Sequence, residues 1–433
     1  MMNFFLIAMI IGGFTTDHDE NTTMVYPPYG HCMGIYRAGQ DQLSMLLGGM
    51  LQFDDPQGLA AVLPLAWDTS DPGDDDELAV YGVNSGSGHI IYNASMYALG
   101  FYGGEGSGPD ELSSPHGIAA TESGIVYVAD TGNHRVAVLK RSGQRISPDT
   151  FIEGFSEPWD VALDGQYIWV TDRAAGTLSR YTSATDPNPV VVSVNSPRGV
   201  AATGYGEHSS GHSACQVVIT DDGTVLTKFV DGAVTATADL SRCGGSFFNF
   251  VEMDYHGNVW VTDSIGCRIH KFDPQLNYLD SWGQGYGDAD DRFLNPTGLA
   301  IWDRFGQIFV AESSGARYFW LGTDIRNLSF SSDGNGCTVS GRLTERATMI
   351  VNVNHADGSV ARNLYSGRRS PGYFNFEWDG TRLQGQNVYA GEYTLSINIE
   401  PIYSSRTYFD KTWLHDFHMD GPEEVEETAG VRR

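Results

Sequence analysis

Lysine is scarce in this chain, and positive charge of any kind is in short supply. Only four of the 26 basic residues are lysine, against 54 aspartate and glutamate residues, so the formal net charge is −28 at pH 7. A protein this acidic repels the phosphates of nucleic acids and of anionic lipids, which argues against both as partners. Salt adaptation and a genomic bias would each explain the shortage of lysine.

The five cysteines form no recognisable metal or redox motif. No pair is spaced as CxxC, and no set of cysteine and histidine residues has the spacing of zinc ligands. In an oxidising compartment Cys243 can pair with Cys215 or with Cys267, and the odd total leaves at least one thiol free.

No stretch is apolar for long enough to cross a bilayer as a helix. The run Asn3–Gly13 covers about ten residues, whereas a transmembrane helix needs about 20. Its length suits a signal peptide, although no Lys or Arg precedes Arg37 and no A-x-A cleavage site follows. We expect residues 1–20 to be a signal or anchor segment that contacts a membrane or a partner. The protein is then exported, to the periplasm or the extracellular space, and is membrane-associated.

Long amphipathic helical patterns are also absent, while the 52 glycines suit a chain with many turns. The stretch Ile125–Leu139 reads IVYVADTGNHRVAVL, two β-rich runs joined by Asp, Gly and Asn, which is typical of a hairpin. A short third strand, entered through Pro115, precedes it. The expected class is therefore all-β.

This three-strand unit recurs along the chain. The last residues of its second strand are Asn84, Asp130, Asp172, Asp221, Asp263 and Glu312, at steps of 46, 42, 49, 42 and 49 residues. A period near 45 with about four short strands per unit is typical of a propeller blade. Six copies predict a six-bladed β-propeller.

The same residues resemble the NHL repeat family of β-propellers. Its pattern is a proline-led G-[IL]-A strand, then VYVAD, then TGNHR and a hydrophobic return strand. The copy at 115–139 matches almost completely, and the hairpin of the fifth copy matches well. The resemblance extends from about Gln52 to about Leu328 and implies a propeller over residues 21–328.

The resemblance also implies that the residue after each strand-leading proline lines a central channel. In NHL-type peptidyl-hydroxyglycine lyases, histidines at such positions in several blades hold zinc. Only one such histidine occurs here, so a three-histidine site is not supported, and we expect no catalytic residue, no metal and no cofactor. The channel-lining candidates are Gln57, His116, Trp159, Arg198, Asn249 and Thr297.

The carboxylates that recur at strand ends have two interpretations. A ring of them could bind calcium, or each could cap the backbone N–H groups of its own turn. Their recurrence in nearly every copy favours the structural role. These residues are Asp130, Asp172, Asp221, Asp263 and Glu312.

After Leu328 the rhythm changes to short strands of alternating polarity, as in Tyr373–Trp378, which predicts a small β-sandwich at 329–400. The segments Trp378-Asp379-Gly380 and Val388–Tyr393 resemble the Ig-like domain of flagellar hook-capping proteins. That resemblance implies an accessory or docking module without enzyme activity.

The two ends of the chain carry further expectations. Residues 401–433 read as an acidic C-terminal tail in which Trp413 and Phe417 are available to dock on a partner. The first ~50 residues are expected to supply the outer strand that closes the sixth blade.

Together these features predict a non-catalytic protein-binding scaffold outside the cytoplasm, as an accessory structural subunit of a larger membrane or surface assembly. The alternative is a metal-dependent lyase or hydrolase acting at the channel, around His116 and Arg198. A divalent ion in the channel would favour the enzyme. A wide apolar loop surface would favour the scaffold.

Overall fold

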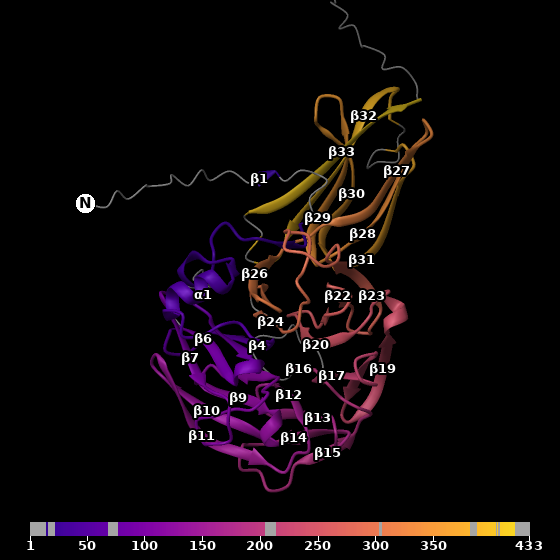
Figure 1. The fold of residues 1–433 in the computed structure, drawn as a ribbon. Helices are drawn as coiled ribbons and strands as arrows, with labels where there is room; N and C mark the ends of the chain where they lie inside the picture. The colour runs from indigo at the N-terminus through magenta and orange to yellow at the C-terminus, as the bar shows by residue number, and fades with distance from the viewer. Residues whose placement is uncertain are drawn as a thin grey trace, which may run out of the picture. The chain divides into compact units, whose positions relative to one another are not determined.

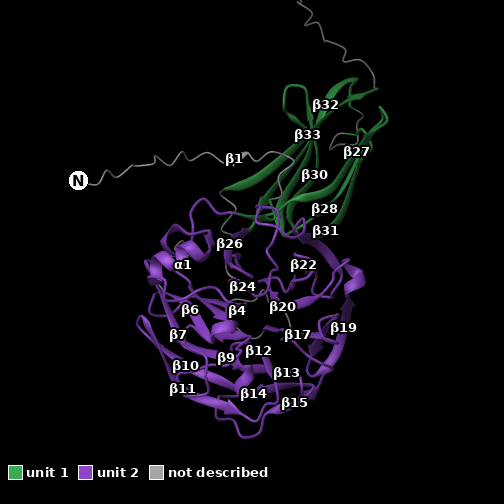
Figure 2. Ribbon diagram, in the orientation of Figure 1, with its two compact units in different colours: residues 1–25, 321–433 green, residues 26–320 purple. Residues whose placement is uncertain are grey.

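The computed structural model describes residues 22–67, 77–203, 214–302, 305–381, 388–403, 405 and 408–420, and the backbone of 14–15. Most of the predicted signal or anchor segment, and the tail beyond 420, lie outside these residues. Two compact units divide the chain: residues 26–320 form one, and residues 1–25 with 321–433 form the other (Figure 2).

The described residues of the larger unit form six successive sheets, here called blades and numbered in chain order (Figure 1). The first three are β4 (Pro56–Val62), β5 (Ala79–Asn84), β6 (His89–Ser95), β7 (Ala98–Gly103); β8 (Ile118–Ala120), β9 (Ile125–Asp130), β10 (Arg135–Ser142), β11 (Arg145–Glu153); and β12 (Pro158–Leu163), β13 (Ile168–Asp172), β14 (Thr177–Tyr181), β15 (Val190–Ser193).

The last three blades follow the same plan. They are β16 (Val200–Thr203), β17 (Cys215–Thr220), β18 (Val225–Val230), β19 (Ala233–Asp239); β20 (Phe248–Met253), β21 (Val259–Asp263), β22 (Arg268–Phe272), β23 (Tyr278–Trp282); and β24 (Leu299–Trp302), β25 (Gln307–Glu312), β26 (Gly315–Leu321) with β3 (Arg37–Ala38). The helical turns are η1 (Cys32–Gly34), α1 (Gln40–Leu47), η2 (Ser85–Ser87), η3 (Thr131–Asn133) and η4 (Leu240–Arg242).

Local sequence explains the hairpin at the middle of each blade. In the second blade, β9 and β10 pair along the whole of β9. Between them runs η3, after which His134 takes the left-handed conformation with φ 57°. Gly88 has the same role in the first blade, with φ 66°, and glycine adopts this conformation without steric cost. The TGNH turn is thus a tight helical turn closed by a left-handed residue.

Small residues let the first strands of neighbouring blades, the inner strands, approach one another. A Cβ added at Gly58 would lie 2.7 Å from the His116 carbonyl oxygen, and one at Gly298 would lie 2.1 Å from that of Gln57. At Gly199 the nearest atom would be a carbonyl oxygen at 2.9 Å. The prediction that crowding near the axis requires a small residue two places after the proline is confirmed for these copies.

Two contacts close the ring between the sixth blade and the first. The Thr297 hydroxyl donates to the Pro56 carbonyl at 2.7 Å, which joins the two inner strands. On the outside, β3 pairs antiparallel with β26. The prediction that the first ~50 residues supply the outer strand of the sixth blade is therefore confirmed.

The smaller unit contains two sheets that share one core. Their strands are β1 (Phe14–Thr15), β33 (Phe409–Met419), β32 (Gly391–Pro401), β29 (Ala347–His355) and β30 (Val360–Arg369) in one, and β27 (Ile325–Ser332), β28 (Cys337–Leu343) and β31 (Gly372–Trp378) in the other; β2 (Met24–Val25) also belongs to this part of the chain. Alternate residues from both sheets, among them Val339, Met349 and Ile397, are fully buried in one cluster. The predicted all-β class, a propeller followed by an Ig-like sandwich, is confirmed.

The sandwich begins earlier and ends later in the chain than the sequence predicts. Strand β27 begins at Ile325, before the predicted boundary at 329. The predicted tail contains β33, which pairs with β32 from Met419 opposite Gly391 to Lys411 opposite Ile399. Alternation along β33 buries Trp413 and Phe417 in the sandwich's own core, so these rings are not available to a partner.

Among the described residues, no helix is long and apolar enough to span a bilayer.

The close approach of the inner strands can be tested at Gly298. We expect Gly298→Ala to lower the free energy of unfolding by about 3 kcal/mol, because the new methyl group displaces the backbone of the first blade. Gly143→Ala is the control, since its Cβ would meet nothing within 4 Å and only its φ of 61° opposes it, a cost of about 1 kcal/mol. Urea unfolding of both variants measures the difference, and equal losses would contradict the tight contact.

Candidate functional site

Each of the six residues predicted to line the channel lies at or just before the start of an inner strand. Three of them are buried and three are partly exposed. The buried residues are Gln57, Trp159 and Asn249, and the partly exposed residues are His116, Arg198 and Thr297.

Three of the six come together in one stack. The rings of His116 and Trp159 lie 3.9 Å apart between centroids, at an interplanar angle of 30°. The Arg198 guanidinium carbon lies 4.5 Å from the centroid of Trp159, and that of Arg173 lies 5.0 Å from it. Such cation–π contacts stabilise a charge that has lost part of its water. The stack therefore places aromatic and cationic groups of three blades side by side.

The charges of this stack are largely neutralised. Arg198 pairs with Asp222, its Nη2 lying 2.8 Å from Oδ1, and Arg173 pairs with Glu157 at 3.0 Å. Burial lowers the pKa of His116 to about 4, so its ring is neutral at pH 7, and its Nδ1 lies 3.0 Å from the Thr131 hydroxyl. The histidine is therefore a neutral, positioned group.

One polar atom of the stack is left without a partner. Trp159 is 8% exposed, and its indole Nε1 has no hydrogen-bond partner among the described residues. An indole N–H can only donate, and a buried donor without an acceptor costs free energy. A ligand that brought an acceptor to this atom would relieve that cost.

Two of the other predicted channel residues, Gln57 and Thr297, have separate partners. The Gln57 side chain donates to Asp55 at 2.7 Å, and Thr297 donates to the backbone of the first blade. Neither hydrogen bond joins the stack, so the six candidates do not form one site.

Two carboxylates of the inner strands escaped the sequence prediction. Asp160 stands two places after Pro158, where four other copies have glycine, and Glu252 stands where the other five copies have alanine. Comparing the copies position by position, and not only at the residue after the proline, would have found both. Asp160 accepts hydrogen bonds from the backbone of Val161 at 2.8 Å and of Val200 at 2.9 Å.

These two carboxyl groups bind protons unusually well. Burial raises the pKa of Asp160 to about 7, although its two backbone hydrogen bonds oppose the shift. Burial, and then the charge of Asp160, raise the pKa of Glu252 to about 8. Carboxyl groups that titrate near neutral pH are suited to general acid–base chemistry.

The strand-end carboxylates hold the loops that precede the inner strands. Asp130 accepts from the Ser113 backbone and from Arg135 Nε, both at 2.7 Å. The others of this kind accept backbone N–H groups as follows: Asp172 from Ser156 and Glu157, Asp263 from Ser246 and Phe247, and Glu312 from Leu294. Asp221 differs, since it is exposed and accepts from the Asn195 side chain.

Within the described ranges, no group of three or more His, Cys, Asp or Glu side chains is placed to hold a metal ion. All five cysteines are free thiols, so neither of the two disulfide pairings considered above is present in this structure.

Two family models match the chain. The NHL repeat matches residues 112–139, and the FlgD Ig-like domain matches residues 327–400. Both resemblances read from the sequence are confirmed. The FlgD-type match covers most of the sandwich but not β33, and the NHL match covers β8, β9 and the first part of β10.

Among curated proteins, human E3 ubiquitin-protein ligase TRIM32 is 30% identical over 283 residues, which cover 58% of this chain and 42% of that protein. Its mouse counterpart is 25% identical, with 41% of its length covered. The chain thus spans about two fifths of the length of these relatives.

Two solved structures show the likeness of fold. A streptogramin B lyase has 14% identity and a TM-score of 0.42, covering 63% of this chain and 95% of that one. PorZ of Porphyromonas gingivalis, a surface component of a type-IX secretion system, has 12% identity and a TM-score of 0.46, covering 88% of this chain and 54% of that one. Scores this low carry no argument about function.

The loop-holding role of the strand-end carboxylates can be tested at Asp130. We expect Asp130→Ala to destabilise the NHL-type propeller by about 3–5 kcal/mol, because it leaves Arg135, 13% exposed, without its counter-ion. Asp221→Ala is the exposed control, with an expected loss of about 1 kcal/mol. Thermal unfolding would show the difference, and a Tm for Asp130→Ala equal to that of the control would refute the role.

The raised pKa of Glu252 predicts a pH dependence of stability. Its folded-state pKa of about 8 lies above the unfolded value, so the folded protein holds a proton that the unfolded chain releases. The free energy of unfolding should therefore fall as the pH rises from about 4 to 8. We expect Glu252→Gln to be about 2 kcal/mol more stable than the wild type at pH 8, with the gap closing toward pH 5.

Urea unfolding at four pH values measures this gap. Glu377→Gln, at an exposed position, is the control and should leave the pH profile unchanged. A gap for Glu252→Gln that is constant with pH would show that its carboxyl group titrates normally.

Proposed function

We propose that this protein is a non-catalytic protein-binding scaffold that acts outside the cytoplasm, as an accessory structural subunit of a larger membrane or surface assembly. NHL repeats are protein-interaction domains, and the TRIM32 relationship fits protein partners. The apolar run at residues 3–13 supports the location outside the cytoplasm.

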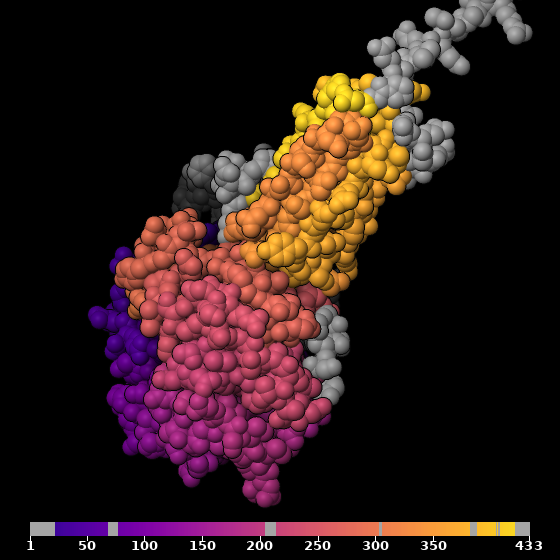
Figure 3. All heavy atoms as spheres, turned by 90° about the vertical axis from the view of Figure 1, so that its right-hand side faces the viewer, coloured from indigo at the N-terminus to yellow at the C-terminus, as the bar shows by residue number. Residues whose placement is uncertain are grey.

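The observation that carries the proposal is a group of exposed apolar side chains on the first blade and the segment before it, here called the apolar surface. Within the described residues this region exposes five large apolar side chains, and no other blade exposes more than two, including the later blades that face the viewer in Figure 3. The five are Met45, Met50, Leu65, Tyr97 and Phe101.

The elements that carry this surface are packed against one another. Leu43 and Leu47 of α1 pack with Leu99 of β7 in one cluster, and the Met33 backbone donates to that of Met96 in the β6–β7 turn at 2.9 Å. Exposed apolar side chains on a rigid frame anchor protein interfaces, and methionine adapts to partners of different shape. A protein partner is therefore the ligand that this face fits best.

A second candidate function is that of a metal-dependent lyase or hydrolase acting at the channel. The carboxyl groups of Asp160 and Glu252, both with a pKa near neutral, favour it because they could move protons near the stack of His116 and Trp159. The two functions predict different results for the same purified sample, a retained protein partner or a bound metal ion.

The experiment that separates them is a native pull-down from the source membranes, with metal analysis of the eluate. We expect the wild type to retain a stoichiometric membrane partner, and Met45→Lys with Met50→Lys to lose at least about 90% of it, because a buried charge at an interface is costly. Tyr286→Lys, which alters an exposed side chain far along the chain (64% exposed), is the control and should retain the partner.

If the Met45→Lys, Met50→Lys variant retained as much partner as the wild type, the interface would not include these two methionines. A lone soluble protein with about one equivalent of zinc or calcium would overturn the scaffold and favour the enzyme.

A further inference from the structure

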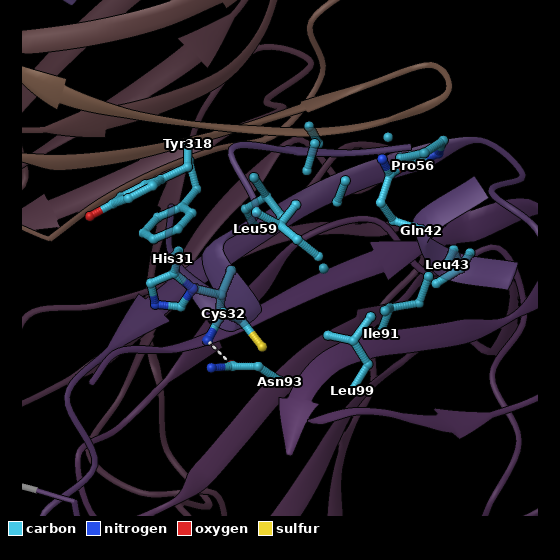
Figure 4. Close-up of a pocket in the computed structure, with 18 of the residues that line it drawn as sticks. His31, Cys32, Gln42, Leu43, Pro56, Leu59, Ile91, Asn93, Leu99 and Tyr318 are labelled. Atoms are coloured by element: carbon cyan, nitrogen blue, oxygen red, sulfur yellow. Dashed lines mark hydrogen bonds between the residues drawn. The ribbon is translucent and has the colours of Figure 1, made fainter. Parts of the chain in front are cut away.

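An apolar cavity of about 140 Å³ lies between the first blade and the sixth (Figure 4). Leu59, Ile91 and Leu99 of the first blade line it, together with Phe309 and Tyr318 of the sixth. The rest of the wall comes from α1, from the residues before it, including 31 and 32, and from further residues of both blades.

The first blade lacks one side chain in the wall of the cavity. Gly82 lines it and stands two places before the end of its strand. Leu59 fills only part of the space, with its Cδ2 3.1 Å from where a Cβ of Gly82 would lie. At the equivalent position the other five blades have fully buried aliphatic side chains: Val128, Val170, Ile219, Val261 and Val310.

Two polar atoms of the lining residues have no hydrogen-bond partner among the described residues: His31 Nε2, and Arg317 Nη2, which lies 3.8 Å from Asp288 Oδ1. His31 lines the cavity, with its ring edge-on to Phe309 at 5.0 Å and to Tyr318 at 5.5 Å. Burial lowers the pKa of His31 to about 4, against a hydrogen bond to the Leu78 carbonyl, so the ring is neutral at pH 7. Its Nε2 is buried without a hydrogen-bond partner among the described residues.

The bonding of His31 determines what Nε2 can do. A neutral imidazole has one N–H and one acceptor nitrogen. Since the ring donates to Leu78, Nε2 is the acceptor. The polar neighbours in the wall are already bonded, because Asn93 accepts from Val80 at 2.7 Å and the Cys32 thiol donates to the Ser95 carbonyl at 3.4 Å. Arg317 is held by its ion pairs with Glu312 and Asp288. The cavity therefore offers mainly apolar walls and, at His31, one free acceptor.

We propose that this cavity is a binding site for a small, mainly apolar molecule that carries one hydrogen-bond donor, of the class and size of phenol. An apolar cavity of about 150 Å³ holds a benzene-sized molecule, which matches the space beside Gly82. The ligand hydroxyl donates to His31 Nε2, and its ring packs against Leu59, Phe309 and Tyr318. The site shares Leu43 and Leu99 with the base of the apolar surface, and none of its residues belongs to the stack of His116, Trp159 and Arg198.

Calorimetric titration of the purified full chain with phenol, and with toluene as the isostere that lacks the donor, tests the proposal. We expect phenol to bind at least about fivefold more tightly than toluene, the effect of one hydrogen bond. His31→Phe keeps an aromatic ring but removes the acceptor, so phenol affinity should fall to that of toluene. Gly82→Val restores the side chain of the other blades and should abolish binding of both.

His89→Phe is the matched control. His89 also lies edge-on to an aromatic ring, Phe101 at 5.6 Å, but does not line the cavity, so phenol affinity should be unchanged. Equal affinities of the wild type for phenol and toluene, no binding of either at millimolar concentration, or unchanged binding by Gly82→Val would each overturn the proposal. If Gly82→Val fails to fold, the ratio of phenol affinity to toluene affinity in His31→Phe tests the proposal by itself, and a ratio equal to that of the wild type would overturn it.

Discussion

A carboxylate at the end of the second strand holds the loop that leads into the inner strand, and the larger unit depends on this contact. Asp130 takes the backbone N–H of Ser113 at 2.7 Å, just before the proline that starts the inner strand. Proline supplies no N–H of its own, and buried backbone donors need partners. The carboxylate therefore positions the inner strand at the axis, where neighbouring strands approach so closely that a Cβ at Gly298 would lie 2.1 Å from a carbonyl oxygen.

Three inner-strand residues replace the glycine or alanine that most copies share, namely Asp160, Phe250 and Glu252, and two of them are carboxylic acids. Burial raises the pKa of both carboxyl groups, Asp160 at a position where four other copies have glycine and Glu252 at a position where the other five have alanine. Beside them His116, Trp159 and Arg198 stack on one another. These polar groups come from the second to the fifth blades, whereas the apolar surface lies on the first blade and the segment before it, and the apolar cavity lies between the first blade and the sixth.

Much of the fold could be read from local patterns. The hairpin of β9 and β10, the prolines and the period near 45 residues depend on neighbours in the chain, so they were found without a structure. The predicted set of channel residues does not include Asp160 and Glu252, because the family resemblance points only to the residue after each strand-leading proline. Strand β33 was not predicted, because its burial depends on pairing with β32. The sequence of the tail does not show that β32 has a free edge to pair with.

By itself the sequence determined the all-β class, the repeated blade, the closing outer strand and the Ig-like module, because turn chemistry and strand alternation are local properties. Only the tertiary structure decided which side chains meet. The stack on Trp159 and the effect of the Asp160 charge on Glu252 each involve side chains of different blades. The buried Nε2 of His31 belongs to a segment that packs against the rings of another blade. The cavity likewise lies where one missing side chain faces a neighbouring blade. Contacts of this kind follow from ring closure, which brings distant segments together and which no local pattern encodes.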